Sequence, residues 1–455
     1  MEKLENYQKG FDDILLKQHA LSIIPPIITK AKTFCCDRTW PRIALILKTL
    51  IENDKPSLKN ECYIGLPDDL PCLRSLVWKI NLRYLPYNVD KWESSLQKKR
   101  NEYIDIKNGF KLRQKVEIEI FQEIESTKDR NSITQEEKNN LFLLSQNTDR
   151  DLLETIDKDV NRTHTNFDFF SKPIKKNDTV SQEEIDQMLI RKRNCTYQDF
   201  KTVYTKGRDS LSNIPFETHA DVLGRILYIY SKLNKDVNYV QGMNEILAPI
   251  YYCYVIGETG ESSDSIEADA FWSFSILMDG IKEMFIKEKD NDKGGIFNKI
   301  EIFEKLIEKL DKSLYKHLKK LDVKMTHFSF RWFNLFFGQD FIIPDILRLW
   351  DTIFSEQDKF YFTYFFSIAI LEMKRKELLQ SDFFGTIKLL QKIDDEDIEV
   401  IISKAINIKK ENEKKCKHII YEKEKKKEDS KTKETGQNDN KKKSEFFKFI
   451  FIKKE

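Results

Sequence analysis

The chain has 455 residues, of which 40% are hydrophobic and 12% aromatic, and its 77 Lys and Arg residues nearly balance its 75 Asp and Glu residues. This composition excludes a disordered chain, and only 14 Gly and 11 Pro argue against a turn-rich β protein. Seven scattered cysteines without C-x-x-C spacing favour a reducing compartment and predict neither a disulfide framework nor a zinc site. Long stretches of Leu, Ile, Phe, Lys and Glu predict an all-α protein.

Charge and hydropathy also bear on location. The charged start MEKLENYQKG lacks the apolar region of a signal peptide, and the longest apolar run, near 246–256, is too short to span a bilayer. Residues 409–455 hold 17 Lys and 10 Asp or Glu, a net charge of +7, which leaves −5 for the rest of a chain whose total is +2. We expect a soluble, cytoplasmic protein whose mildly acidic body does not bind nucleic acid.

The first elements in chain order are amphipathic helices. Residues 1–62 are predicted to form an N-terminal helical extension, broken at Pro25-Pro26 and Trp40-Pro41. The segment 63–86 is predicted as a loop entering a helix, because its apolar residues between Leu73 and Ile80 recur at i, i+3 and i+4. A polar insertion with one or two helices is expected at about 106–150.

The second half is more regular. A second polar insertion is predicted at about 171–210, after which a dense helical pattern runs from Phe216 to Leu390. We divide the chain into a main domain at 63–358, C-terminal helices packed on it at 359–408, and a basic, largely disordered tail at 409–455.

The end of the tail changes character. The stretch EFFKFIFIKKE places a cluster of Phe and Ile residues between lysines. One interpretation is that this cluster attaches the protein to an anionic membrane surface. The alternative is a docked terminal helix or strand. No C-a-a-X box ends the sequence, so prenylation is not predicted.

Motifs for self-contained catalysis are missing from the sequence. It holds no G-x-x-x-x-G-K-[ST] loop, no H-E-x-x-H pair and no nucleophile elbow, and its six histidines are isolated. We therefore predict neither a metal site nor a nucleotide-binding loop of its own.

Two polar stretches stand out against this background. ETIDKDVNRTHTNFDFF (154–170) places Asp159 and Arg162 three residues apart on one helix face, and NYVQGMN (238–244) places Gln241 between two apolar helices. An Arg and a Gln held at helix ends are the two side chains that GTP hydrolysis needs. A positioned Gln orients the attacking water, and an Arg supplied in trans neutralises charge on the γ-phosphate.

Four motifs appear in one order along the chain. They are LPCLRSLVW with Arg74 and Trp78, then IDKDVNR, then YVQGMN, and finally SFRWFNLFFGQDFIIPDILRLWDTIF with Trp350 and Asp351. Together they cover roughly 64–355, and in this order the chain resembles the TBC-domain Rab GTPase-activating proteins, with strings most like the subgroup of TBC family member thirteen.

The resemblance implies a fold and a mechanism. The fold is all-α with two helical subdomains, and the partner is a Rab-family small GTPase in its GTP-bound form. Arg162 would act as an arginine finger, and Gln241 would replace the catalytic Gln of the GTPase. The protein would need no cofactor of its own, since the Rab brings GTP and Mg²⁺, and it would act in vesicle trafficking, peripherally on endomembranes.

The remaining motif residues are expected to support these two. Asp159 would hold Arg162, Tyr239 would anchor the seam in the core, Gly242 would permit close backbone approach, and Asn244 would hydrogen-bond the loop that carries Gln241. Four more are expected to be architectural: Arg74, Trp78, Trp350 and Asp351.

Other interpretations stay open at this point. Arg162 could cap helix carbonyls and Gln241 could be an ordinary polar residue at a helix start. The whole protein could be a non-catalytic helical adaptor for a Rab or another trafficking partner, or a lipid-binding protein acting through its tail. Asn161, His164 and Thr165 depart from the family pattern beside Arg162 and bear on the choice of partner.

Overall fold

The computed structural model of the chain describes residues 23–34, 39–126, 148–174, 217–286, 289, 292, 294–393 and 396–431. Within these ranges every regular element is a helix, and the one extended pairing is an isolated bridge between Pro173 and Thr218. The expected all-α fold is therefore confirmed. The second predicted insertion beyond Ile174 and the Phe/Ile/Lys end of the tail lie outside the described residues.

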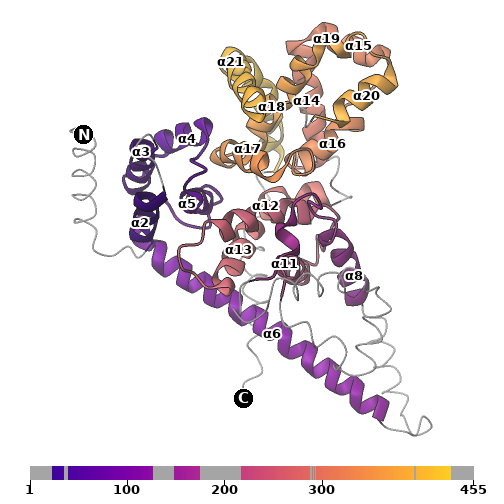
Figure 1. The fold of residues 1–455 in the computed structure, drawn as a ribbon. Coiled ribbons are helices and arrows are strands. Elements are labelled where there is room, and N and C mark those ends of the chain that lie inside the picture. The colour runs from indigo at the N-terminus through magenta and orange to yellow at the C-terminus, as the bar shows by residue number, and fades with distance from the viewer. Residues whose placement is uncertain are drawn as a thin grey trace, which may run out of the picture.

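The first group of helices forms one side of the molecule (Figure 1). Its members are α2 (Ile24–Phe34), α3 (Trp40–Ile51), α4 (Lys55–Ile64) and α5 (Pro71–Asn81). The last three each carry a proline in the first turn, where the missing N–H costs nothing and the fixed φ suits a helix. Because α5 packs between α12 and α17, its residues are buried from Cys72 to Asn81.

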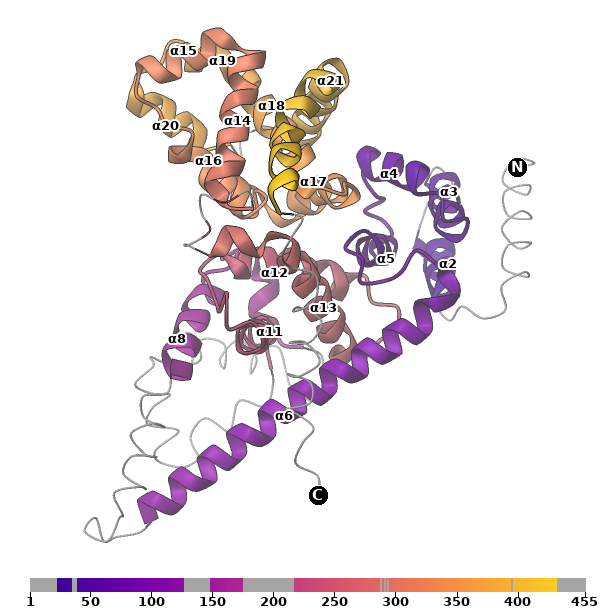
Figure 2. The same ribbon diagram turned by 180° about the vertical axis from the view of Figure 1, so that it is seen from behind.

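The second group holds the segments that will carry the candidate site. It comprises α6 (Trp92–Ser126), α8 (Thr148–Val160), α11 (His219–Leu233), α12 (Met243–Ile256) and α13 (Ser263–Ile281), with short 3-10 turns η1 (Val89–Lys91), η2 (Asp168–Ser171) and η3 (Lys282–Phe285). A capping box of Thr218 and Asp221 starts α11, which packs on α8. Figure 2 shows α6 running diagonally past this group.

The predicted insertion at 106–150 begins inside a helix. α6 is continuous over 35 residues, and its first half packs against α13. Tyr103 and Ile106 are buried there, and Lys107 pairs with the buried Glu267 of α13 at 2.8 Å. The start of the predicted insertion is therefore a helix that packs on α13, and its Lys107 pairs with a buried carboxylate.

The third group follows in sequence. It comprises α14 (Ile296–Leu310), α15 (Lys312–Lys320), α16 (Thr326–Asn334), α17 (Ile343–Ser355), α18 (Lys359–Met373), α19 (Arg375–Leu378), α20 (Phe383–Gln391) and α21 (Ile398–Lys431). α18 is apolar on all sides and is buried from Phe360 to Leu371, since it packs against α16, α17 and α21. α17 connects the three groups of helices, because it contacts α4 and α5 of the first group and α12 of the second.

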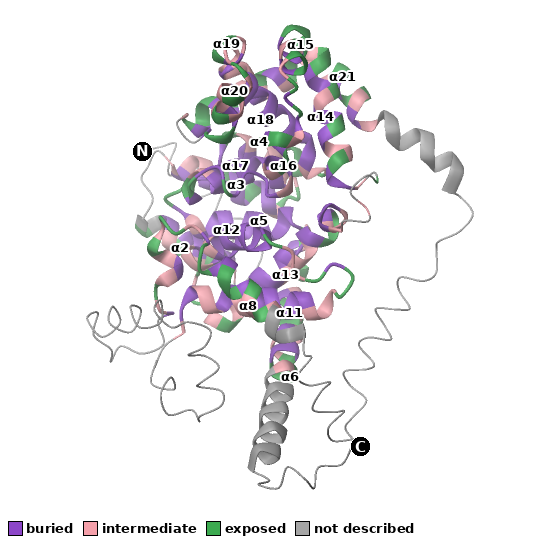
Figure 3. Cartoon of the chain, turned by 90° about the vertical axis from the view of Figure 1, so that its right-hand side faces the viewer, coloured by how far each residue is buried: buried purple, intermediate pink, exposed green. Residues whose placement is uncertain are grey.

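The predicted disordered tail at 409–455 needs a correction at its start. α21 continues to Lys431, and its side chains as far as Tyr421 pack on α18. Ile408, Cys416 and Ile420 form a buried stripe at helical spacing. Figure 3 shows buried, intermediate and exposed residues along the described part of α21. Lys409 reaches Glu356 at 3.1 Å, so part of the positive charge assigned to a free tail holds the helix in place. Average hydropathy missed this narrow stripe among lysines.

Candidate functional site

Arg162 lies in the turn that follows α8. The helix ends at Val160, and the next three backbone N–H groups donate to carbonyls of the last helical turn at 3.0–3.1 Å. The Thr163 hydroxyl also donates to the Asp159 carbonyl at 3.0 Å. The turn is therefore shaped by main-chain bonds and does not depend on the Arg162 side chain.

The Arg162 side chain is held on one side and open on the other. Its Nη2 donates to Asp159 Oδ1 at 2.7 Å, and its Nε donates to the Lys158 carbonyl at 3.0 Å. The Arg162 side chain is 66% exposed, whereas Asp159 is 5% exposed. Asp159 thus orients the guanidinium without burying it, and Nη1 has no partner among the described residues.

Gln241 lies at the end of the loop that leads into α12. The next residue, Gly242, has φ +102°, a left-handed conformation that favours glycine. A Cβ at this position would come within 2.9 Å of the Leu335 side chain. Gln241 itself is exposed, and within the described ranges nothing hydrogen-bonds its side chain. The glycine fixes the backbone and leaves the Gln241 amide at the surface.

Tyr239 and Asn244 connect the two segments. The Tyr239 hydroxyl donates to Asp159 Oδ2 at 2.8 Å and lies 3.3 Å from Asn244 Oδ1. Burial and the Asp159 carboxylate raise the pKa of Tyr239, so this hydroxyl keeps its proton and can donate. Asn244 Nδ2 donates to Thr163 Oγ1 at 2.8 Å. The carboxylate that holds Arg162 therefore also holds the loop that carries Gln241.

The structure adds detail to two expected supporting roles. Tyr239 is partly buried and packs against the hydrophobic core, while its hydroxyl extends to Asp159; Met243 beside it is fully buried. Asn244 makes its shorter bonds to the Arg162 turn, and its one contact with the Gln241 loop is Tyr239. The motif asparagine thus bridges two segments instead of closing one loop.

A deeper layer of polar residues was missed from sequence. Glu245 is buried in the first turn of α12, and its Oε1 accepts from Asn244 Nδ2 at 3.1 Å and from Gln339 Nε2 at 3.2 Å. Burial raises the pKa of Glu245 to about 7. His164 Nε2 lies 3.3 Å from Glu245 Oε2, and burial lowers the pKa of His164 to about 4. An acid directly before a long apolar run was the available signal.

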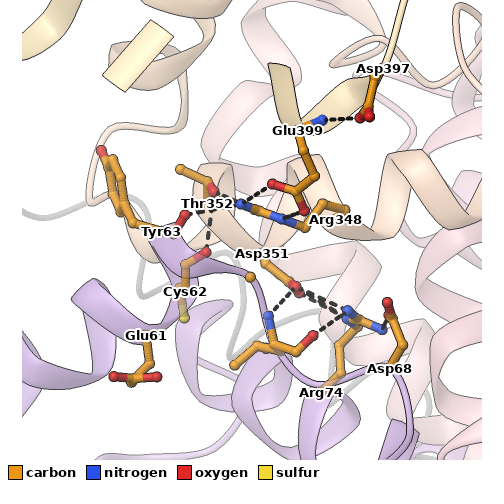
Figure 4. A network of polar contacts seen from close by, with 12 residues as sticks. Glu61, Cys62, Tyr63, Asp68, Arg74, Arg348, Asp351, Thr352, Asp397 and Glu399 are labelled. Atoms are coloured by element: carbon orange, nitrogen blue, oxygen red, sulfur yellow. Dashed lines mark hydrogen bonds and ion pairs between the residues drawn. The ribbon is translucent and has the colours of Figure 1, made fainter. Parts of the chain in front are cut away.

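The other motif residues lie in the interior, and Figure 4 shows Arg74 and Asp351 facing each other there. Arg74 is 2% exposed, and its Nε donates to Asp351 Oδ1 at 3.1 Å while its Nη2 donates to Oδ2 at 3.2 Å. Asp351 also accepts from Trp78 Nε1 at 2.8 Å and from the Leu66 backbone N–H at 2.9 Å. This network ties α5 to α17, and Arg74 Nη1 also pairs with the exposed Asp68 at 2.7 Å.

Trp350 belongs to the same interior. It is fully buried, its Nε1 donates to the Phe336 carbonyl at 2.8 Å, and its ring lies 6.1 Å from that of Trp78. The neighbouring Arg348 pairs with Glu399 at 2.6 Å, which attaches the start of α21 (Figure 4). The structure therefore separates the motif residues into an exposed pair, Arg162 and Gln241, and a buried set.

The described ranges hold neither a metal-binding cluster nor a membrane-spanning helix. No group of three or more His, Cys, Asp or Glu residues there is arranged to hold a metal ion. Among the same residues, no helix combines the length and apolar character that crossing a membrane demands. The chemistry available at this surface is that of a guanidinium and a carboxamide.

Comparison with known proteins defines the class. A sequence profile of the Rab-GTPase-TBC domain matches residues 177–379, which include Gln241 but not Arg162. TBC1 domain family member 13 of Mus musculus is 32% identical over 365 residues, which span 74% of this chain and 90% of that protein. The chain thus belongs to the TBC domain family of Rab-GAP proteins.

Within this family the similarity runs to the member-thirteen subgroup. The Homo sapiens member 13 is 31% identical over the same shares of both chains, and a TBC domain-containing protein of Schizosaccharomyces pombe is 28% identical over 417 residues, 74% of this chain and 67% of that one. The fold matches the crystal structure of the Ypt/Rab-GAP domain of Gyp1p with a TM-score of 0.53 and 22% identity, over 85% of this chain and 98% of that domain.

Proposed function

We propose that this protein accelerates GTP hydrolysis by a Rab-family small GTPase in its GTP-bound form. The observation that carries the proposal is that Arg162 and Gln241 are both exposed, and that one buried carboxylate, Asp159, bonds both Arg162 and Tyr239 of the loop that carries Gln241. Family membership supports the class of partner. An adaptor would have no need for two exposed polar side chains on a shared rigid support.

Arg162 supplies the positive charge. Its Nε and Nη2 are held by Lys158 and Asp159, and Nη1 is left to point at a partner. A guanidinium placed on the γ-phosphate stabilises charge that spreads over the phosphoryl oxygens in the transition state, and such fingers contribute about 10³–10⁵ in rate. A fixed guanidinium matches two phosphate oxygens, which an ammonium does not.

Gln241 positions the water. Its carboxamide can accept one hydrogen bond from the attacking water and donate one to a phosphate oxygen. In this role Gln241 takes the place of the glutamine that the GTPase would otherwise bring. Gly242 and Leu335 hold the backbone behind it, so that little freedom is lost when the partner docks.

The proposal includes partner and location. The GTPase brings GTP and Mg²⁺, so the activator needs no cofactor and performs no reaction of its own. It would act in the cytoplasm, peripherally on endomembranes, in vesicle-mediated transport. Binding of the tail to an anionic membrane stays a prediction, because its Phe/Ile/Lys end lies outside the described residues.

The first test replaces Arg162. In a panel of GTP-loaded Rab proteins, Arg162→Ala should lower the accelerated hydrolysis rate by about 10²–10⁴, and Arg162→Lys should not restore it. The melting temperature should stay that of the wild type, because the turn is held by main-chain bonds. Full activity of Arg162→Ala on a Rab that the wild type accelerates would refute the mechanism, and Rab binding without any acceleration would support the adaptor.

The second test separates the two fingers. Gln241→Ala should also lower the rate by about 10² or more, as loss of a water-positioning group does. A Rab whose own catalytic glutamine is changed to leucine should still respond to the wild-type protein. Complete resistance of that Rab would mean that the protein supplies the arginine alone.

A further inference from the structure

His164 occupies an unusual place beside the arginine finger. It lies two residues after Arg162 with φ +44°, in a left-handed region that is uncommon for any residue other than glycine. Its ring is 10% exposed and stacks on Phe170, with ring centroids 6.2 Å apart. The backbone of the turn thus directs an imidazole inward, at a position where the sequence departs from the family pattern.

The imidazole faces a buried carboxyl group. His164 Nε2 is buried without a well-aligned hydrogen bond in the described part of the chain, and the atom facing it is Glu245 Oε2 at 3.3 Å. Glu245 Oε1 already accepts from Asn244 and Gln339. Oε2 is therefore the oxygen that remains for His164, and an unpaired buried nitrogen would be costly.

From this geometry we infer that His164 and Glu245 are a positioning pair, which shares one proton and fixes the Arg162 turn against the start of α12, directly after Gln241. The inference rests on the proposed function for its effect on GTP hydrolysis. The pair adds a second connection beneath the hydrogen bond between Asp159 and Tyr239. It links the end of α8 to α12, and Gln339 extends this link to the segment before α17. Loosening it would change the distance between the two fingers.

Histidine suits this position because it can exchange donor and acceptor roles. When Glu245 is ionised, the Nε2–H tautomer donates to Oε2. When Glu245 is protonated, the proton lies on Oε2 and is donated to a bare Nε2, with the other tautomer present. The bond therefore persists through the titration of Glu245.

The charged surroundings agree with this assignment. α8 presents Asp159, whose negative charge raises the pKa of Glu245, and the loop before α12 presents the neutral hydroxyl of Tyr239. The segment before α17 presents the uncharged Gln339, while its neighbour Asp340 is paired with Arg331. Arg162 reaches the cluster through Asp159. None of these facing groups supplies a proton to Oε2, which leaves His164.

The pair can be tested without any GTPase. ¹⁵N NMR of the imidazoles, with the His164 signals identified by their loss in His164→Phe, should show a neutral ring from pH 8 to pH 5. The dominant tautomer should change from Nε2–H to Nδ1–H with a midpoint near pH 7. In Glu245→Gln the tautomer should stay Nδ1–H throughout. A ring that becomes cationic near pH 6.5, or a tautomer unaffected by Glu245→Gln, would refute the pair.

The kinetic test is a double-mutant cycle on a Rab that the wild type accelerates. His164→Phe and Glu245→Ala should each lower kcat about tenfold with KM within about twofold, and the double variant should lose no more than either one. Glu245→Gln, which can still donate to Nε2, should stay within about twofold of the wild type. His317→Phe on α15 is the matched control and should not change the rate.

The two proposals fail differently. If the wild type accelerates no GTPase, the proposed function fails and NMR still decides the pair. If the wild type is active and His164→Phe equals it, or if the two losses multiply to about a hundredfold, only the positioning pair is refuted. Melting curves of all variants exclude general unfolding as the cause.

Discussion

Two arginine–aspartate pairs in this molecule have the same chemistry and opposite surroundings. Arg162 bonds Asp159 at 2.7 Å with its guanidinium largely in solvent, and Arg74 bonds Asp351 with both partners buried. Asp351 accepts from Arg74, Trp78 and the Leu66 backbone, so both of its carboxylate oxygens are bonded. Asp159 accepts from Arg162 and Tyr239, and its arginine keeps a free nitrogen.

The comparison shows how one motif type can serve two purposes. A buried and fully bonded arginine has no way to reach a partner without leaving an uncompensated charge inside the protein, which would cost several kcal/mol. An exposed arginine on a buried carboxylate can leave or share that carboxylate at little cost, because water solvates it. Solvent exposure therefore distinguishes the structural pair, Arg74 and Asp351, from the pair available to a partner, Arg162 and Asp159.

The largest expected effect comes from removing the two buried indole rings of Trp78 and Trp350. Trp78→Ala and Trp350→Ala should each destabilise the fold by about 3–5 kcal/mol, since both rings are fully buried and each donates a hydrogen bond. That is a large share of the roughly 5–15 kcal/mol that holds a domain together. Thermal melting should show a drop of about 10 °C and poor solubility.

Trp272→Ala is the matched control, because Trp272 is only partly buried and should cost less. If Trp350→Ala melts like the wild type yet fails to accelerate GTP hydrolysis, Trp350 belongs to the partner surface. The division between buried architecture and exposed chemistry would then be wrong.

The next effect compares the two carboxylates directly. Asp351→Asn keeps the shape but removes the buried counter-charge of Arg74 and leaves only the exposed Asp68, so it should cost about 3 kcal/mol in unfolding free energy. Asp159→Asn should cost about 1 kcal/mol or less, because Arg162 is solvated. It should nevertheless lower GTPase activation, since the guanidinium loses its orientation. Equal destabilisation by both changes, measured by urea unfolding, would remove the contrast.

Much of this fold was predictable from the sequence. The helical spacing around Trp78 and the proline at the start of α5 place that helix within a few residues, and the apolar run after Gln241 gives α12. α21 was not found beyond residue 408, because a stripe of Ile408, Cys416 and Ile420 is narrow beside many lysines. Segment averages record the charge and miss which side of the helix carries it.

Only part of the candidate site could be predicted from the sequence. Arg162 and Gln241 lie in short motifs that a single sequence displays, and their roles stay predictions. The pairing of His164 with Glu245 joins residues 81 positions apart and depends on the left-handed backbone at His164. The local pattern of apolar residues predicts neither this contact nor this backbone conformation. Hydrogen bonds between distant segments, such as that of Tyr239 with Asp159, need the folded chain.

The layer beneath the exposed pair should respond to pH, and the sign of the response follows from two shifted pKa values. Burial raises the pKa of Glu245 from 4.5 to about 7 and lowers that of His164 from 6.5 to about 4. Glu245 therefore destabilises the fold increasingly as pH rises from 4.5 to 7, and His164 does so increasingly as pH falls from 6.5 to 4, each by up to roughly 3 kcal/mol.

Between pH 4.5 and 6.5 these two slopes oppose each other, because the native pair holds its proton on Glu245 and the unfolded chain holds it on His164. The wild-type pair should then add almost no pH dependence, whereas the single variants should reveal one slope each, of about 1.4 kcal/mol per pH unit. Relative to the wild type, Glu245→Gln should gain stability as pH rises from 5 to 6.5, and His164→Phe should lose it. Urea unfolding at these two pH values measures both differences. Parallel behaviour of the two variants would show that the residues titrate like solvated groups, and the buried layer behind Arg162 would then be no more ordered than the surface above it.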